Sequence, residues 1–133
     1  MSTSGRLATA GVILLGEREG KLSVALVRSH EAEPALPTGP VLSGDSLQQA
    51  AQRVLREETG LDARLVTYLG PMARRSGGGF ATVFMFLAFA VSTNNPDTRV
   101  EWLAPKRMLE AIPSEDERAF LRERLSPLLR SDE

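Results

Sequence analysis

Two adjacent carboxylates, Glu57 and Glu58, are the residues of this sequence whose type and position best suit chemistry. They come just after an apolar stripe, a set of apolar residues whose spacing places them on one face of a helix: Leu47, Ala50, Ala51, Val54 and Leu55. At about 100° of rotation per residue, Glu58 falls near the centre of the stripe and Glu57 at its edge. Carboxylates so placed, in the last turn of a helix, are costly unless they are paired or bind a metal. The pattern predicts either a divalent metal site or a structural salt bridge to Arg53 or Arg56.

The other potential ligands narrow the kind of metal. The chain has no cysteine, which excludes thiolate metal sites and disulfides. His30 is the single histidine, so a site built from several histidines is excluded, and we interpret His30 as a loop residue. Because carboxylate oxygens are hard ligands, they favour Mg²⁺ or Mn²⁺ over Zn²⁺.

A basic, glycine-rich segment is the second candidate for ligand contact. Arg74 and Arg75 lie just before three glycines, where their guanidinium groups could meet a phosphate on a mobile loop. The alternative is a solvated hairpin tip without a ligand. Trp102 and Tyr68 are the candidates for stacking on a base. The phenylalanines of the long apolar run are expected in the core: Phe80, Phe84, Phe86 and Phe89.

Periodicity and turn signals predict the elements that position these residues. Strands are expected at 6–15, 22–27, 63–69, 80–91 and 100–103, a turn at 94–97, helices at 105–112 and from 114 onward, and a proline- and glycine-rich loop at 30–44. Asp45 or Ser46 starts the helix that carries the acids, with Gln48 or Gln49 completing a capping box, and Gly60 ends it. We expect one α/β domain spanning 1–133, with a mixed sheet covered by helices on both faces.

Composition limits the partners. Of 133 residues, 42% are hydrophobic and 25% charged, and the net charge of −1 creates no field that would draw the chain to a nucleic-acid polymer or a membrane. The apolar run at 7–15 is too short to cross a bilayer. We expect a cytoplasmic protein whose partner is a small phosphate-containing molecule, and a homodimer is left open.

Residues 39–61 resemble the signature of the Nudix hydrolases, G-x5-E-x7-R-E-U-x-E-E-x-G-U, where U is aliphatic. The residues that match at the right spacing are Gly39, Arg53, Leu55, Glu57, Glu58, Gly60 and Leu61. Asp45 stands in place of the first glutamate, and Val54 in place of the glutamate after the arginine. The leading hairpin, the Leu36-Pro37 approach and the segment 101–103 also look Nudix-like.

The resemblance implies an α/β/α sandwich that hydrolyses a nucleoside diphosphate linked to another group. It assigns Glu57, Glu58 and the backbone carbonyl of Gly39 to a Mg²⁺ or Mn²⁺ ion, and it makes Arg53 the residue that orients the acids. Asp45 becomes a catalytic candidate by its position in the motif, although it also suits a helix N-cap.

Val54 departs from the family pattern at a position that in many members binds metal or acts as general base. Valine can do neither, and the loss of a general base typically costs about 10²–10⁴ in rate. Either another acid supplies the base, the enzyme is slow, or the fold binds a nucleotide without cutting it. Glu101, Glu115 and Asp116 are the acids available outside the motif.

Overall fold

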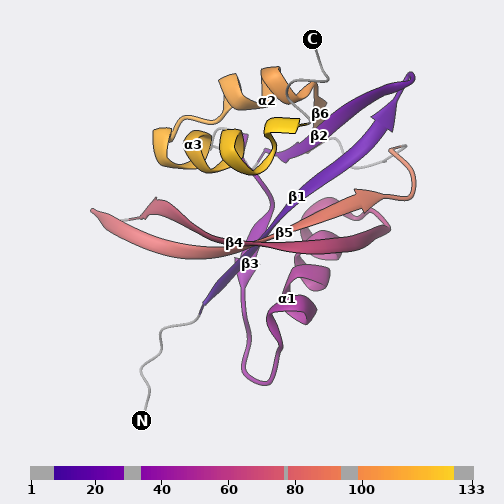
Figure 1. Cartoon of the computed structure of the whole chain (residues 1–133). Helices are drawn as coiled ribbons and strands as arrows, with labels where there is room; N and C mark the ends of the chain where they lie inside the picture. Colours follow the sequence, from indigo (N-terminus) through magenta and orange to yellow (C-terminus); the bar gives the residue numbers. More distant parts are fainter. Residues whose placement is uncertain (1–7, 29–33, 77, 94–98, 128–133) are drawn as a thin grey trace.

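The computed structural model describes residues 8–28, 34–76, 78–93 and 99–127 (Figure 1). Within them lies a mixed sheet in the order β4-β5-β1-β2-β6, with β3 paired to β1. The strands are β1 (Thr9–Arg18), β2 (Lys21–Val27), β3 (Thr38–Pro40), β4 (Ala63–Ser76), β5 (Gly79–Ala90) and β6 (Val100–Leu103). β1 runs parallel to β5, and the other pairings are antiparallel.

The hairpin between β1 and β2 is confirmed, but its turn is tighter than the sequence suggested. Arg18 pairs with Lys21, so only Glu19 and Gly20 lie between the strands. Both have positive φ, 54° and 79°. A two-residue turn with positive φ at both positions matches the right-handed twist of the strands it joins. β1 therefore continues to Arg18, beyond the end expected at Leu15.

Helices cover both faces of the sheet, which confirms the predicted α/β sandwich (Figure 1). The helix α1 (Leu47–Val54) packs against β1, β3 and β5, and α2 (Pro105–Ala111) and α3 (Glu115–Arg124) pack on the other face. Two hydrophobic clusters fill the two interfaces, one around Ile13, Met85 and Leu121 and the other around Val12, Ala51 and Val54.

The loop expected at 30–44 contains an element that the sequence did not reveal. Residues 38–40 form β3, which pairs with residues 9–11 of β1, and Ala35 forms an isolated bridge to Val27. A three-residue strand of threonine, glycine and proline has neither alternation nor β-branched enrichment, so no pattern signals it. His30 lies outside the described residues.

The segment expected as a basic loop is mostly strand. β4 extends through Ser76 and pairs with β5 up to the register Ser76 with Gly79, so Arg74 stands on a strand rather than on a loop. The expected burial of the phenylalanines is also wrong for most of them. Phe86 is buried and Phe84 is partly buried, whereas Phe80 and Phe89 are exposed. Phe80 lies beyond the part of β5 that pairs with β1, which begins at Val83.

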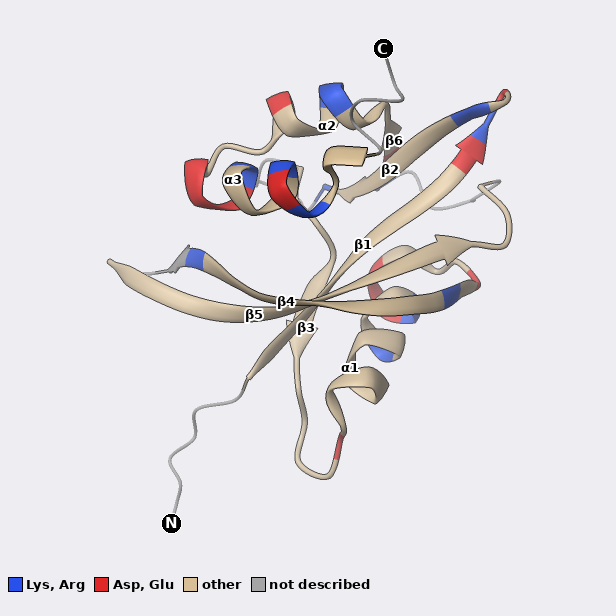
Figure 2. Ribbon diagram, in the orientation of Figure 1, with Lys and Arg blue, Asp and Glu red and all other residues tan. Residues whose placement is uncertain are grey.

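The remaining elements agree with the sequence to within a few residues. β6 spans the expected 100–103, α2 begins at Pro105, and the Ser114 side chain caps α3. The turn expected at 94–97 lies outside the described residues. Among the described helices, none combines the length and the apolar character needed to cross a membrane. Figure 2 shows charged residues gathered on α2, α3 and the β1–β2 hairpin tip.

Candidate functional site

The start of α1 separates the roles of Asp45 and Ser46. Ser46 is the N-cap: its side chain accepts from the Gln49 amide at 3.0 Å, and the Gln49 side chain accepts from the Ser46 amide at 2.9 Å. This is a complete capping box. The N-cap interpretation of Asp45 is therefore wrong, and its carboxylate is available for another partner.

That partner is Arg53. Arg53 Nη1 lies 2.6 Å from Asp45 Oδ2, and the Leu42 amide donates to the same oxygen at 3.0 Å. The hydrogen bond from Arg53 lowers the pKa of Asp45 below its ordinary value of 3.8, aided by the amide. Arg53 Nη2 also donates to the Pro40 carbonyl at 2.8 Å. Asp45 and Arg53 thus tie the end of β3 and the following loop to α1.

The acids lie on a wider helical turn that no 3.6-residue pattern predicts. Residues 55–59 form a π-helical turn, η1 (Leu55–Thr59), which ends at Gly60 with φ of 68° and ψ of 12°. Gly60 is thus the left-handed cap that the sequence predicted. The fully buried Thr59 hydroxyl donates to the Leu55 carbonyl and accepts from the Leu61 amide at 3.2 Å, which satisfies backbone groups at the helix end.

The acids are less buried than the residues at the two ends of this turn. Leu55 and Thr59 are buried, Glu58 is only partly buried, and Glu57 is exposed. Glu58 is thus more exposed than the apolar residues of the stripe with which the sequence grouped it. Within the described chain neither acid takes part in an ion pair, so the predicted alternative of a salt bridge to Arg53 or Arg56 is wrong.

Gly39 reaches the same helix through Val54. A Cβ built on Gly39 would lie 3.0 Å from Val54 Cγ2, so the β3 backbone packs closely on α1 and a side chain at position 39 would have to displace Val54 slightly. Val54 is 3% exposed and belongs to the core cluster on this face. The contact places Gly39 beside the helical turn that leads to Glu57 and Glu58, one helical turn after Val54.

The acids proposed as replacement bases lie elsewhere or have partners. Glu101 is on β6 and pairs with Arg28 at 3.4 Å. Glu115 binds Arg118 at 2.7 Å and Arg122 at 3.1 Å, and the Arg118 hydrogen bond lowers the pKa of Glu115. Asp116 is exposed in the first turn of α3. In the described part of the chain, no three acids or histidines come together as a ready-made metal cluster.

An acid that the sequence did not single out, Glu117, binds Arg74 from α3, on the face of the sheet opposite α1 (Figure 1). It is 7% exposed and binds Arg74 side-on, with Nε to Oε2 at 3.2 Å and Nη2 to Oε1 at 3.3 Å. Arg74 Nη1 also donates to Thr38 Oγ1 at 3.0 Å. Arg74 and Glu117 are 43 residues apart, so no local spacing could reveal the pair. The Arg75 side chain lies outside what the structure describes.

The NUDIX domain model matches residues 5–124. The chain belongs to the NUDIX domain family. No curated protein sequence matches this Nudix chain. The fold is shared with solved structures: a C. elegans Ap4A hydrolase binary complex matches with a TM-score of 0.79 and 18% identity over 95% of this chain and 99% of that one.

Two further structures extend the range of Nudix proteins with this fold. RenU, a Nudix hydrolase from M. smegmatis, matches with a TM-score of 0.67 and 22% identity over 97% of this chain and 90% of that one. NrtR from Shewanella oneidensis, whose structure was solved with a 27mer DNA, matches with a TM-score of 0.68 and 20% identity. The match covers 95% of this chain but 64% of that one. At these identities the matches establish the shared fold.

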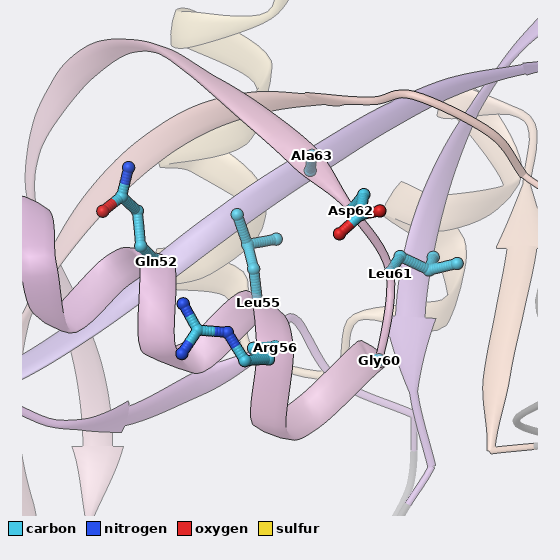
Figure 3. A pocket seen from close by; sticks show the side chains of 7 residues that line it. All are labelled: Gln52, Leu55, Arg56, Gly60, Leu61, Asp62 and Ala63. Atoms are coloured by element: carbon cyan, nitrogen blue, oxygen red, sulfur yellow. The ribbon is translucent and has the colours of Figure 1, made fainter.

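Three of the cavities lined by the described residues differ in size and lining. One of 290 Å³ lies at the end of the motif helix between Gln52, Arg56 and Asp62 (Figure 3). One of 210 Å³ lies beside Tyr68, which packs against Phe86 with ring centroids 5.1 Å apart. The largest of the three, 470 Å³, contains Arg74 and Glu117 and has mostly apolar walls. Its volume lies well within the range of about 300–1,000 Å³ typical of small-molecule sites.

Proposed function

We propose that this Nudix domain is a metal-dependent pyrophosphohydrolase acting on a nucleoside diphosphate linked to another group. The observation that supports it is the Glu57–Glu58 pair. These carboxylates match the motif positions that the Nudix resemblance assigns to metal. Of the two basic residues expected to neutralise them, Arg53 is bound to Asp45 and Pro40 instead, and Arg56 makes no ion pair with them in the described chain. Acids left without a counter-ion in the described chain suit a divalent cation.

The available donors match Mg²⁺ or Mn²⁺. Magnesium usually binds one or two carboxylates and completes its shell with water and substrate phosphate, so a cluster of three protein acids is not required. Glu57, Glu58 and the Gly39 carbonyl would hold the ion. When bound there, it would offset negative charge on the phosphate oxygens and lower the pKa of the attacking water.

The remaining motif residues position this site. Arg53 anchors both the Pro40 carbonyl and Asp45, so it fixes the chain next to Gly39 relative to the helix. We assign Arg53 and Asp45 this positioning role rather than proton transfer, because each side chain is already engaged by the other. Arg74 is paired with Glu117, whose carboxylate lies 3.2 Å from Arg74 Nε.

Val54 supports a second candidate, a Nudix module that binds a nucleotide with little turnover. Val54 is buried against Gly39 and carries no acid, and no third acid of the described chain completes a cluster with Glu57 and Glu58. The two candidates share the metal site and the ligand class, and they differ in the rate of bond cleavage.

A product-release screen separates the two candidates. The protein is incubated with nucleoside diphosphate conjugates, dinucleoside polyphosphates including Ap4A, and nucleoside triphosphates, each with Mg²⁺, Mn²⁺ or a chelator, and products are separated by chromatography. We expect cleavage at a pyrophosphate bond with metal, none with chelator, and none in Glu58→Gln. Binding of the same ligands without cleavage would favour the second candidate, and neither binding nor cleavage would contradict both.

A further inference from the structure

The 470 Å³ cavity between the sheet and α3 contains an arginine whose charge is already balanced. Arg74 lines the cavity and is held side-on by the buried carboxylate of Glu117. Figure 2 also shows basic residues on α3. Two of them, Arg118 and Arg122, form ion pairs with Glu115, so their charges are balanced as well. A phosphate in this cavity would lie beside a buried carboxylate and would be repelled by it. The arginine is therefore poorly suited to the phosphate contact that the sequence suggested.

The walls of the cavity favour a flat, uncharged group. They include Pro34, Ala35, Ile112 and Pro113, with Ser114 as a further polar neighbour. Small-molecule sites typically combine such apolar surfaces with a few fixed polar groups that set orientation. A nucleobase has this character, with two apolar faces and a hydrogen-bonding edge.

Arg74 supplies the fixed polar group. A guanidinium has five N–H donors, and three are used here, two by Glu117 and one by Thr38. The other two N–H donors of Arg74 have no hydrogen-bond partner within the described chain. Three anchors also fix the plane of the guanidinium, which makes the direction of the remaining donors specific.

Neighbouring residues of β3 contact Arg74 of the cavity wall and Val54 of the motif helix. The Thr38 side chain faces Arg74, while the next residue, Gly39, faces Val54 on the opposite side of the strand. β3 pairs with β1 alone among the described strands, so one edge of this short strand has no strand neighbour there. A ligand with its phosphates at Gly39 can therefore extend its other end toward Arg74.

We propose that this cavity binds the base of the substrate and that Arg74 selects a 6-oxopurine, guanine or hypoxanthine, over adenine. This inference rests on the proposed function. Guanine presents adjacent O6 and N7 acceptors, which match two arginine donors, whereas adenine presents an amino donor beside N7. Arg74 is a specificity-determining residue, and Glu117 is a positioning residue that acts through it.

Binding of nucleoside monophosphates without metal tests the proposal apart from catalysis. Calorimetric titration of the wild-type protein with GMP, IMP and AMP should give similar affinities for GMP and IMP and an affinity for AMP that is lower by about tenfold or more. IMP lacks the 2-amino group of GMP and so isolates the acceptor edge. Equal affinity for the three nucleotides, or no binding of any, would overturn the proposal without any variant having to fold.

Variants then assign the preference to particular side chains. Arg74→Lys keeps the charge but loses the paired donors, so the GMP to AMP ratio should fall towards one, and Glu117→Gln should lower the ratio by releasing the guanidinium. The matched control is Arg122→Lys on α3, whose partner Glu115 is outside the cavity lining. A ratio unchanged in Arg74→Lys would contradict the assignment.

The two proposals can fail separately. The monophosphate titration uses no metal and no pyrophosphate bond, so a missing base preference leaves metal-dependent cleavage at Glu57 and Glu58 untouched. Conversely, a protein that discriminates GMP from AMP but cleaves nothing retains the base site and loses the hydrolase assignment.

Discussion

At the scale of single residues, Arg53 decides how the acids are interpreted. The sequence allowed it to neutralise Glu57 or Glu58, but the structure turns it to Asp45 and the Pro40 carbonyl. The first departure from the Nudix pattern, aspartate for glutamate at position 45, is thereby accommodated. The shorter side chain of Asp45 still reaches the motif arginine, and the same carboxylate oxygen accepts a hydrogen bond from the Leu42 amide.

The Asp45–Arg53 pair predicts a pH dependence of stability. The folded-state pKa of Asp45 is lowered, chiefly by the Arg53 hydrogen bond, so the pair contributes stability above the unfolded-state pKa near 3.8 and loses it as the pH falls through the lower folded-state pKa. Asp45→Asn should therefore melt at a lower temperature than wild type at pH 7. The difference should shrink in melts at successively lower pH, as the pH falls from 3.8 through the lowered folded-state pKa. A difference that stays constant over this range would show that the carboxylate charge is not the cause.

The valine at position 54 makes it possible to test whether the site lacks a general base. If the site lacks a base, Val54→Glu should raise turnover by about 10²-fold or more, because a carboxylate returns one turn before Glu58. The same change places a charge at a position 3% exposed, which should cost a few kcal/mol of folding free energy in the absence of metal.

Rate and stability of the Val54 variant are measured together, with Val54→Gln as the matched control. Glutamine has the size of glutamate but cannot act as a base at neutral pH, so it should give the destabilisation without the gain in turnover. A Val54→Glu variant that folds but is no faster than wild type would show that the base comes from elsewhere in the chain.

At the scale of elements, the π-helical turn shapes the acid pair. Its residues Leu55 and Thr59 are in the core, Glu58 is partly buried and Glu57 is exposed. Turns of this kind occur frequently at functional sites. In this protein the buried Thr59 hydroxyl bonds backbone groups on both sides of the turn.

Thr59→Val tests that hydroxyl. Valine keeps the shape but leaves the Leu61 amide and the Leu55 carbonyl without this partner, which should cost about 1–3 kcal/mol of unfolding free energy. Because the turn carries the acids, the affinity for Mg²⁺ should fall as well. Denaturant titrations with and without Mg²⁺ measure both effects, and Thr59→Ser, which keeps the hydroxyl, should behave much more like wild type. Wild-type metal affinity in Thr59→Val would separate the turn from the metal site.

Local sequence patterns were sufficient to predict most helices and strands, but not the geometry of the candidate site. The capping residues, the glycine at position 60 and the apolar stripe predicted the motif helix, because each acts within one or two turns. β3 and the π-helical turn were missed, since the first is three residues long and the second breaks the assumed rotation. The Arg74–Glu117 contact joins β4 to α3, and such tertiary pairs leave no spacing signal in one sequence.

At the scale of the whole molecule, the acid pair and the largest of the three cavities lie on opposite faces of the sheet. The face covered by α1 carries the acids, and the face covered by α3 carries the cavity of Arg74 and Glu117 (Figure 1). β3 contacts both sides, because the Thr38 side chain accepts from Arg74 and Gly39 packs closely against Val54. The proposed function needs both faces, because a nucleotide has a phosphate end and a base end.

Binding of Mn²⁺, followed by electron paramagnetic resonance, tests the metal site most directly because it needs no substrate. Wild-type protein should bind Mn²⁺, and Mg²⁺ should compete. Glu57→Gln and Glu58→Gln should each weaken binding by at least about tenfold, a loss no smaller than that seen for outer-shell residues. Glu110→Gln, which removes an exposed acid on α2, is the matched control and should bind as wild type does. Wild-type affinity for Mn²⁺ in both Glu57→Gln and Glu58→Gln would contradict a metal site at these residues.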